Sequence, residues 1–297
     1  MQSKTQPIVY ILGALLIAML VYVWKHSMHT APPAISFAPA GADYQAKPDF
    51  AHLEYQHPIP PEQLALITPQ YLASLDQEQI GQIYARLSAG PIPDGPFDGD
   101  LFFPKGSSGT LRATEILGGM KGLLAQFKGK KLELLGRALW KGKVFYREEG
   151  VLRNRIDDSL LIKPMIQGDL ADLPKIDVNG RDAWLLFPAK LYCGQSLLDS
   201  RRESIIIDYA FSDEIAGYRE RPDFLAGRRG FKVRDEIRMV YPGLYLGRAY
   251  LDRVFLLNFT LYSKDIAERD SDAFFKTGQV QEDCWVGTQT RRVAAAP

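Results

Sequence analysis

Residues 61–297 contain no histidine, because all four histidines, His26, His29, His52 and His57, come earlier in the chain. Serine and cysteine hydrolases need an imidazole to take the proton of the nucleophile, and hydrolytic zinc sites rely mainly on histidine ligands. This absence argues against both kinds of site in the larger part of the chain. The four histidines fall in a proline-rich stretch, which is a poor frame for a metal site.

Cysteine is almost as scarce as histidine. The chain has two cysteines, Cys193 and Cys284, and their spacing matches neither a zinc knuckle nor a redox pair. They either form one disulfide or remain two free thiols, and the sequence leaves both options open.

An excess of basic charge is also missing, since 36 lysines and arginines stand against 35 aspartates and glutamates. Proteins that bind nucleic acid normally carry a basic face or domain, so no nucleic-acid partner is expected. The chain has no P-loop, no G-x-G-x-x-G and no G-x-S-x-G motif, and no cofactor is predicted. Carboxylate or lysine catalysis through Asp157, Asp158, Asp208 or Lys190 is the remaining enzymatic route. We interpret these four instead as surface acids and an ordinary strand lysine.

One long hydrophobic run without charge occurs, at residues 8–24. It has the shortest length that usually spans a bilayer, and no small-residue cleavage site follows promptly, as a signal peptide would require. We predict a retained transmembrane anchor after a short cytoplasmic tail at residues 1–7. The protein would be a single-pass inner membrane protein with its globular domain in the periplasm. The opposite orientation stays open, because the positive charges before the run, Lys4 and the amino terminus, only slightly outnumber Lys25 after it.

The anchor is followed by a spacer at residues 25–61, which is rich in proline and in small or polar residues. Such composition favours extended chain over a packed core, so we expect the spacer to bury little. The globular domain is then residues 62–297. Its entry, residues 62–134, is predicted to be helical and rich in turns, and residues 139–290 to be rich in β-strands.

Within the entry, Asp76 and Gln79 have the spacing of a capping box, and apolar residues follow at helical intervals. This pattern predicts a helix that begins at Asp76 and ends before Gly90. Residues 90–100 are dense in proline and glycine, so we expect a series of turns there and no strand.

A second amphipathic segment, residues 110–127, has an apolar helical face interrupted by three glycines, each of which weakens a helix. Lysines crowd this segment and the residues after it. It is either a core-packed helix with a solvated lysine face or a lid that contacts a membrane or lipid, where each basic charge contributes about 1 kcal/mol. The membrane-facing candidates in the second interpretation are Lys121, Lys128, Lys130 and Lys131.

Beyond Leu139 the pattern changes to strand-length apolar runs separated by glycine, proline, asparagine and aspartate. This cadence is typical of an antiparallel barrel or sandwich, and few helices are expected. The fold class is therefore mainly β. The clearest part is a three-strand meander over residues 234–240, 244–250 and 254–262.

The turns of the meander predict a register in which Val240 pairs with Leu244 and Tyr250 with Val254. Because side chains alternate faces along a strand, one face of the meander is apolar except for Asp235. The opposite face is polar. It carries Arg234, Glu236, Arg238, Arg248, Tyr250, Asn258 and Thr260.

The polar face has two interpretations. It is the solvated surface of the sheet, with Arg248 between Glu236 and Leu256, or it lines the mouth of a barrel. In the second case the arginines suit a carboxylate or phosphate head, because a guanidinium fork holds either group through two bonds. The candidate ligand-binding residues are then Arg238, Arg248, Tyr250, Asn258 and Glu236.

Residues 139–145, Leu-Trp-Lys-Gly-Lys-Val-Phe, are followed by Asn154-Arg155 and, much later, by the closing strands. In this order of parts the chain resembles lipocalin-like (calycin) barrels, and more narrowly the bacterial family named for a Gly-x-Trp-x-Gly motif. Ala138 stands where the first glycine of that motif belongs. The resemblance implies a barrel with a lipophilic cavity, in which Trp140 plugs the closed end, and it assigns no ligand.

The leading hypothesis is a membrane-anchored cell-envelope protein whose barrel-like domain binds or shuttles a lipophilic ligand, with an anionic head as one option. The second is an envelope scaffold or assembly protein that binds another protein through its sheet edge or the helix within residues 62–88. The third is an enzyme acting on a lipid-like substrate without histidine. A large apolar cavity would favour the ligand-binding hypothesis. A broad exposed apolar patch would favour the scaffold, and carboxylates clustered inside a cavity would favour the enzyme.

Overall fold

The computed structural model describes residues 35–40, 47–102, 140–157, 162–163, 166–178 and 180–287. The predicted anchor at residues 8–24 lies outside this part of the chain. So do the candidate membrane-facing residues, which are Lys121, Lys128, Lys130 and Lys131. Within the described residues, no helix is both long enough and apolar enough to cross a membrane.

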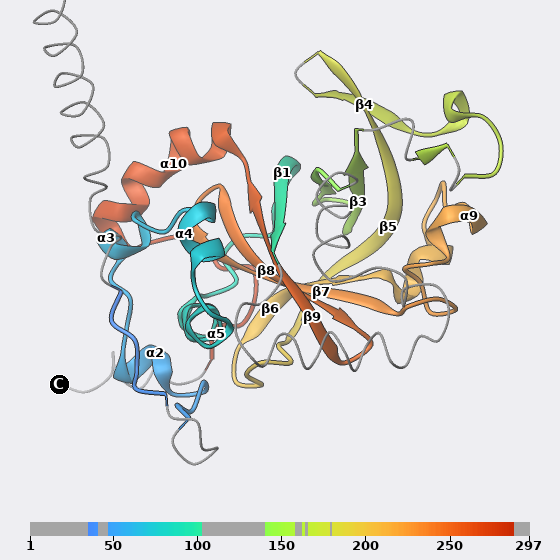
Figure 1. The fold of residues 1–297 in the computed structure, drawn as a ribbon. Coiled ribbons are helices and arrows are strands. Elements are labelled where there is room, and N and C mark those ends of the chain that lie inside the picture. Colours follow the sequence, from blue (N-terminus) through green and yellow to red (C-terminus); the bar gives the residue numbers. More distant parts are fainter. Residues whose placement is uncertain are drawn as a thin grey trace, which may run out of the picture. The chain divides into compact units, whose positions relative to one another are not determined.

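The described residues from Ser36 onward belong to one unit, built around a β-sheet that Figure 1 shows with most of the helices gathered on one side of its strands. The helices are α2 (Leu53–Gln56), α3 (Pro61–Leu64), α4 (Pro69–Ser74), α5 (Gln77–Arg86), α9 (Glu220–Asp223) and α10 (Lys264–Thr277), with 3₁₀ turns η2 (Leu170–Asp172) and η3 (Tyr209–Glu214). The strands are β1 (Gly95–Phe102), β2 (Gly142–Tyr146), β3 (Val151–Ile156), β4 (Lys175–Val178), β5 (Arg181–Gln195), β6 (Glu203–Asp208), β7 (Val233–Tyr241), β8 (Leu244–Leu251) and β9 (Val254–Tyr262).

The sheet closes on itself. Its nine described strands follow the order β3-β2-β1-β9-β8-β7-β6-β5-β4, and β3 also pairs with β5. The eight strands other than β4 therefore form a closed antiparallel barrel in which strands consecutive in the chain are neighbours and the first pairs with the last. This confirms the prediction of a mainly β, antiparallel barrel with a few helices.

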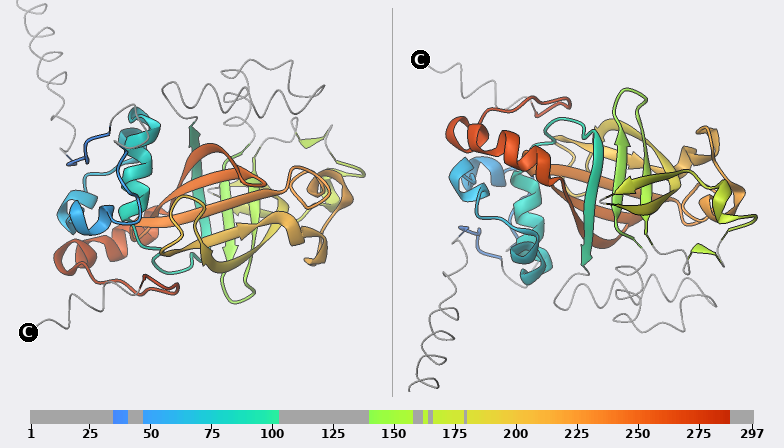
Figure 2. Two further views of the ribbon diagram at one scale, coloured as in Figure 1. Left: turned by 90° about the horizontal axis from the view of Figure 1, so that it is seen from below. Right: turned by 90° about the horizontal axis from the view of Figure 1, so that it is seen from above.

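Helices α2, α3, α4, α5 and α10 lie together on one side of the barrel, and α9 lies on the opposite side with the β4 hairpin, as both views in Figure 2 show. The capping box that predicts α5 is present: Asp76 Oδ1 accepts from the Gln79 amide at 2.8 Å, and Gln79 Oε1 accepts from the Asp76 amide at 3.2 Å. The prediction of this helix is confirmed.

Two elements differ from the expectation. Residues 95–102 form β1, although the dense proline and glycine predict only turns, because this segment pairs with both β2 and β9 and so closes the barrel. The 14-residue helix α10 is also unexpected. Its sequence is mostly polar, with Ser271 and Phe274 as its buried residues, so the apolar periodicity that predicts helices is weak there.

The register of the meander is shifted at both turns. Tyr241 pairs with Leu244 and Leu251 with Val254, because each strand pair has an irregularity next to its turn. The predicted Glu236–Arg248 pair is correct, but the β9 partner of Arg248 is Asn258, in place of Leu256. The irregularity in the second pair brings Phe255, predicted on the apolar face, opposite Tyr250 and onto the outer face, where its ring contacts Arg248. Residues 257–261 keep their predicted faces, because their shift of two residues preserves the alternation.

The apolar face of the meander points into the barrel. One half of the interior is filled by the rings of Phe97, Phe145 and Tyr245, with centroids of Phe97 5.5 Å from Phe145 and 5.8 Å from Tyr245. The Tyr245 hydroxyl donates to the carbonyl of Pro91 at 2.6 Å, so the chain that enters β1 lies against this filled half. The disulfide left open by the sequence is formed, and it joins Cys193 of β5 to Cys284.

Residues 47–61, expected to bury little, pack on the domain in part. Leu53 of α2 is fully buried in a cluster with Ala38 and Ala85. Arg86 donates to the carbonyls of Ser36 at 2.8 Å and His57 at 3.0 Å. Because of these contacts, the folded unit begins before residue 62. The proline-rich composition predicts locally extended chain but gives no sign of the long-range contacts.

We expect Leu53→Ala to lower the free energy of unfolding by about 2–5 kcal/mol, because it removes a fully buried side chain and leaves a cavity. Leu66→Ala is the matched control, since half of the Leu66 side chain is exposed. Thermal and denaturant unfolding of the two variants would measure the difference. Equal stabilities would show that α2 is not part of the folded unit.

Candidate functional site

A cavity of about 340 Å³ lies in the half of the barrel nearer α9. Most of its wall is apolar and comes from several strands and from the chain between α9 and β7. The apolar residues are Leu101, Trp140, Ile156, Phe187, Leu225, Ala226, Phe231, Val233, Ala249, Leu257 and Phe259. The polar residues are Lys143, Asn154, Tyr209 and Asp235, called here the interior polar cluster.

Lys143 is the centre of the interior polar cluster. Its ammonium group donates to Asn154 Oδ1 at 2.9 Å, to the Tyr209 hydroxyl at 2.6 Å and to Asp235 Oδ2 at 2.9 Å. These groups come from β2, β3, the first residue of η3, and β7, so closure of the barrel is what brings them together. Each member is at most 6% exposed. Lys143 and Asp235 therefore form a buried ion pair.

Asn154 links the interior polar cluster to the cavity wall. Its Oδ1 also accepts from Trp140 Nε1 at 2.9 Å, and its Nδ2 donates to the carbonyl of Phe187 at 3.1 Å and to the Tyr209 hydroxyl at 2.9 Å. All four hydrogen-bonding positions of the amide are thus in use. The amide fixes the Trp140 ring and the Tyr209 ring relative to Lys143.

Three aromatic rings surround the ammonium group. Lys143 Nζ lies 5.4 Å from the ring centroid of Trp140, 5.3 Å from that of Tyr209 and 5.4 Å from that of Phe259. A cation within about 6 Å of an aromatic face is stabilised by the ring quadrupole. The rings therefore help to offset the loss of water around a buried charge.

The ionisation of the cluster follows from its burial and its charges. Burial has the largest influence on Lys143 and lowers its pKa, but Asp235 and Tyr209 together outweigh it, and the pKa of Lys143 is raised above its ordinary value. Burial, with a smaller contribution from Asp235, raises the pKa of Tyr209 to about 12 against the opposing effect of Lys143. At neutral pH the lysine is charged and the tyrosine is neutral.

Phe187 holds an unusual backbone conformation at the cavity wall. Its φ is +52°, a region that bulky residues rarely occupy. The Phe187 amide donates to Asp223 Oδ1 at 2.7 Å, while Asp223 Oδ2 accepts from the Arg219 amide at 2.9 Å. Burial raises the pKa of Asp223. This carboxyl group and Asn154 together fix the strained peptide that places the Phe187 ring against the cavity.

Two glycines make room for rings in the barrel. A β-carbon at Gly247 would lie 2.2 Å from the ring of Phe259, and one at Gly99 would lie 2.4 Å from the ring of Trp140. The two rings contact each other edge to face at 5.6 Å. Trp140 thus forms cavity wall, and the filled half of the barrel is occupied by Phe97, Phe145 and Tyr245. The plugging role that the resemblance implies for Trp140 stays a prediction.

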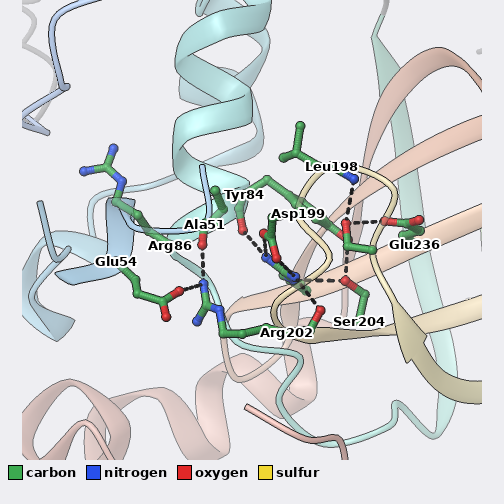
Figure 3. Close-up of polar contacts among 12 residues, drawn as sticks. Ala51, Glu54, Tyr84, Arg86, Leu198, Asp199, Arg202, Ser204 and Glu236 are labelled. Carbon is green, nitrogen blue, oxygen red and sulfur yellow. Dashed lines mark hydrogen bonds and ion pairs between the residues drawn. The ribbon is translucent and has the colours of Figure 1, made fainter. Parts of the chain in front are cut away.

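The ligand-binding residues predicted from the sequence lie elsewhere. Both interpretations of the polar face are wrong: it neither faces solvent nor lines the barrel, because α5 and residues 196–204 cover it on the outside of the barrel (Figure 3). All five candidates are at most 3% exposed. They are Arg238, Arg248, Tyr250, Asn258 and Glu236.

Arg238 is the central residue of this outer network. Its guanidinium group donates to both oxygens of Asp199, at 2.7 and 3.2 Å, and to Ser204 Oγ at 3.0 Å. It also donates to the carbonyls of Tyr84 at 3.1 Å and Arg202 at 3.2 Å. All five N–H donors are occupied, which leaves none for a ligand.

The other members of the polar face have structural partners as well. Glu236 accepts from Ser196 Oγ at 2.7 Å and from the Leu197 amide at 2.8 Å. Arg248 Nε donates to the Tyr250 hydroxyl at 2.9 Å, and its guanidinium lies 4.3 Å from the ring centroid of Phe255. Asn258 Nδ2 donates to Gln77 Oε1 at 2.6 Å. The contacts of Glu236 attach residues 196–204 to the barrel, and that of Asn258 attaches α5.

The acids and lysine considered for catalysis are also accounted for. Asp208 Oδ1 accepts from the Ala210 amide at 2.8 Å, Lys190 pairs with Glu214 at 2.5 Å, and Asp157 lies 3.3 Å from Arg155 Nε. Asp158 lies outside the described residues. No member of the interior polar cluster was predicted from the sequence as a site residue, although Asp235 stands out as the one charged residue on the predicted apolar face of the meander.

Comparison of the chain with protein-family models, with curated proteins and with solved structures found no match.

Proposed function

We propose that the barrel binds a small lipophilic molecule in its cavity and orients it by the interior polar cluster. The observation that carries this proposal is a cavity of about 340 Å³ whose described lining comprises eleven apolar and four polar residues. Small-molecule sites are typically cavities of about 300–1,000 Å³ with apolar walls and a few placed polar groups. Burial of apolar ligand surface would supply most of the affinity.

Binding without chemistry suits the interior polar cluster better than catalysis does. A general base or nucleophile works best with a pKa near the operating pH. The pKa values of Lys143 and Tyr209 are both raised, which keeps both groups protonated at neutral pH. Protonated donors beside a single carboxylate are suited to hold a polar head group in place.

The proposal includes a location at a membrane, which rests on the sequence alone. Residues 8–24 form an uncharged apolar run long enough to anchor the chain, and a tethered barrel could exchange a lipophilic ligand with the bilayer. We expect the full-length protein to sediment with inner membranes and its globular domain to be cleaved by protease added from the periplasmic side. Recovery of the protein in the soluble fraction would remove the anchor from the proposal.

The binding proposal is tested by mass spectrometry of small molecules extracted from the purified full-length protein. We expect a lipophilic compound to co-purify with the parent protein and to be lost from Ala249→Phe, which places a ring in the cavity. Ala273→Phe on the exposed face of α10 is the matched control and should retain the compound. Equal recovery from both variants would place any bound lipid outside the cavity.

A further inference from the structure

We propose that the ligand of this cavity carries an uncharged head that both donates and accepts a hydrogen bond, such as a hydroxyl or an amide, and not a carboxylate or phosphate. This inference rests on the proposed binding function and specifies its ligand class. It replaces the anionic head considered from the sequence, because the arginines that suggested an anion lie outside the barrel.

The charges in the cavity wall disfavour an anionic head. Among the described residues that line the cavity, Lys143 and Asp235 carry the charges, and they neutralise each other at 2.9 Å. Both are buried. An anionic head would add an unbalanced negative charge to an apolar interior, which is strongly unfavourable without a counterion. A neutral head adds none.

The donors of the interior polar cluster favour a head that accepts a hydrogen bond. The three N–H bonds of Lys143 are directed at Asn154, Tyr209 and Asp235. The Tyr209 hydroxyl accepts from Lys143 and from Asn154, whereas its own proton has only long contacts, 3.3 Å to Asn154 Oδ1 and 3.4 Å to Asp235 Oδ2. Hydroxyl donors normally lie within about 3.0 Å of their acceptors. Tyr209 is therefore the donor available to a ligand.

The acceptors of the interior polar cluster favour a head that also donates a hydrogen bond. The contacts of Asp235 with Lys143 and Tyr209 all use Oδ2, so within the described part of the chain Oδ1 accepts no hydrogen bond. A ligand donor placed there would satisfy the carboxylate without disturbing the ion pair. A head group that accepts a hydrogen bond from the Tyr209 hydroxyl and donates one to Asp235 Oδ1 would give each of these two groups a partner.

The test compares three straight-chain ligands of nearly equal apolar bulk, with ten or eleven carbons each: 1-decanol, decyl methyl ether and decanoate at pH 8. Each would displace the uncharged fluorescent probe N-phenyl-1-naphthylamine from the full-length protein held in an amphipathic polymer. The Ala249→Phe variant serves as the blank for partition into the polymer. We expect decanol to bind about threefold to tenfold more tightly than the ether, which cannot donate, and at least about tenfold more tightly than decanoate.

A charge variant gives the matched control. Asp235→Asn leaves Lys143 as an uncompensated cation, so decanoate should bind it at least about tenfold more tightly than it binds the parent protein. Lys143→Met with Asp235→Asn restores neutrality, and decanoate should again bind weakly. Circular dichroism establishes that each variant is folded, and the parent series decides the question if Asp235→Asn does not fold.

The outcomes separate the two proposals. If decanoate binds the parent protein as tightly as decanol, or more tightly, the uncharged head is wrong while the cavity remains a binding site. If none of the three ligands displaces the probe and no compound co-purifies, the binding function itself is wrong. Both proposals are supported if the parent protein binds decanol most tightly, then the ether, then decanoate, and if Asp235→Asn binds decanoate more tightly than the parent does.

Discussion

Replacing Arg238 by leucine is expected to lower the free energy of unfolding by about 3–5 kcal/mol, the usual cost of removing one partner of a buried ion pair. Arg238 is fully buried and Asp199 is 5% exposed. The substitution leaves the Asp199 carboxylate without the guanidinium that pairs with it, removes the side-chain donor to the Arg202 carbonyl, and leaves the Tyr84 carbonyl with the Leu87 amide alone. Denaturant unfolding followed by circular dichroism measures the loss.

A matched exposed arginine separates burial from charge. Arg229 pairs with Glu220 at 2.6 Å, and both side chains are more than half exposed. Surface pairs contribute little to stability, so Arg229→Leu should unfold at nearly the same denaturant concentration as the parent. Arg238→Leu should also keep its ligand affinity at temperatures where it is folded, because Arg238 does not line the cavity. A silent Arg238→Leu would mean that the outer network does not attach α5 to the barrel.

For Arg238, the sequence predicts the face of the strand but not what packs against it. The alternation of side chains placed Arg238 and Glu236 on the face opposite Asp235 correctly, because a two-residue repeat is a local property of a strand. What lies against that face is not local. Tyr84 and Arg238 are separated by 154 positions, and no periodicity in either segment indicates that α5 packs there.

The site was harder to predict than the fold. The meander and the capping box depend on residues that are close in sequence, and both are confirmed. Lys143 and Asp235 are 92 positions apart and meet only when β1 pairs with β9 and closes the barrel. Asp235 carried a local signal, as an acid on an apolar face. Such a residue requires a buried partner, and Lys143 and Asn154, both within the resemblance to lipocalin-like barrels, were available to supply it.

Lys143→Met is the second substitution with a large expected effect. It removes the only cation among the described residues that line the cavity and leaves Asp235, which is 4% exposed, without its ion-pair partner. The free energy of unfolding should fall by about 3–5 kcal/mol, whereas Lys143→Met with Asp235→Asn should recover most of the loss, because no uncompensated charge is then buried. A double variant as unstable as Lys143→Met would show that the hydrogen bonds to Asn154 and Tyr209 matter more than the ion pair.

The dependence on pH gives an independent measurement. The pKa of Lys143 is raised in the folded protein, so its stabilising contribution is fully present below the pKa of an unfolded lysine, about 10.4, and is lost as the pH rises through the higher folded value. Tyr209, with a pKa raised to about 12, acts in the same direction. Between about pH 10 and 12 the parent should therefore lose more stability than the Lys143→Met, Asp235→Asn double variant, in which Tyr209 still titrates but the ion pair is gone. Parallel pH profiles for the two proteins would show that the lysine is not stabilised as a cation inside the barrel.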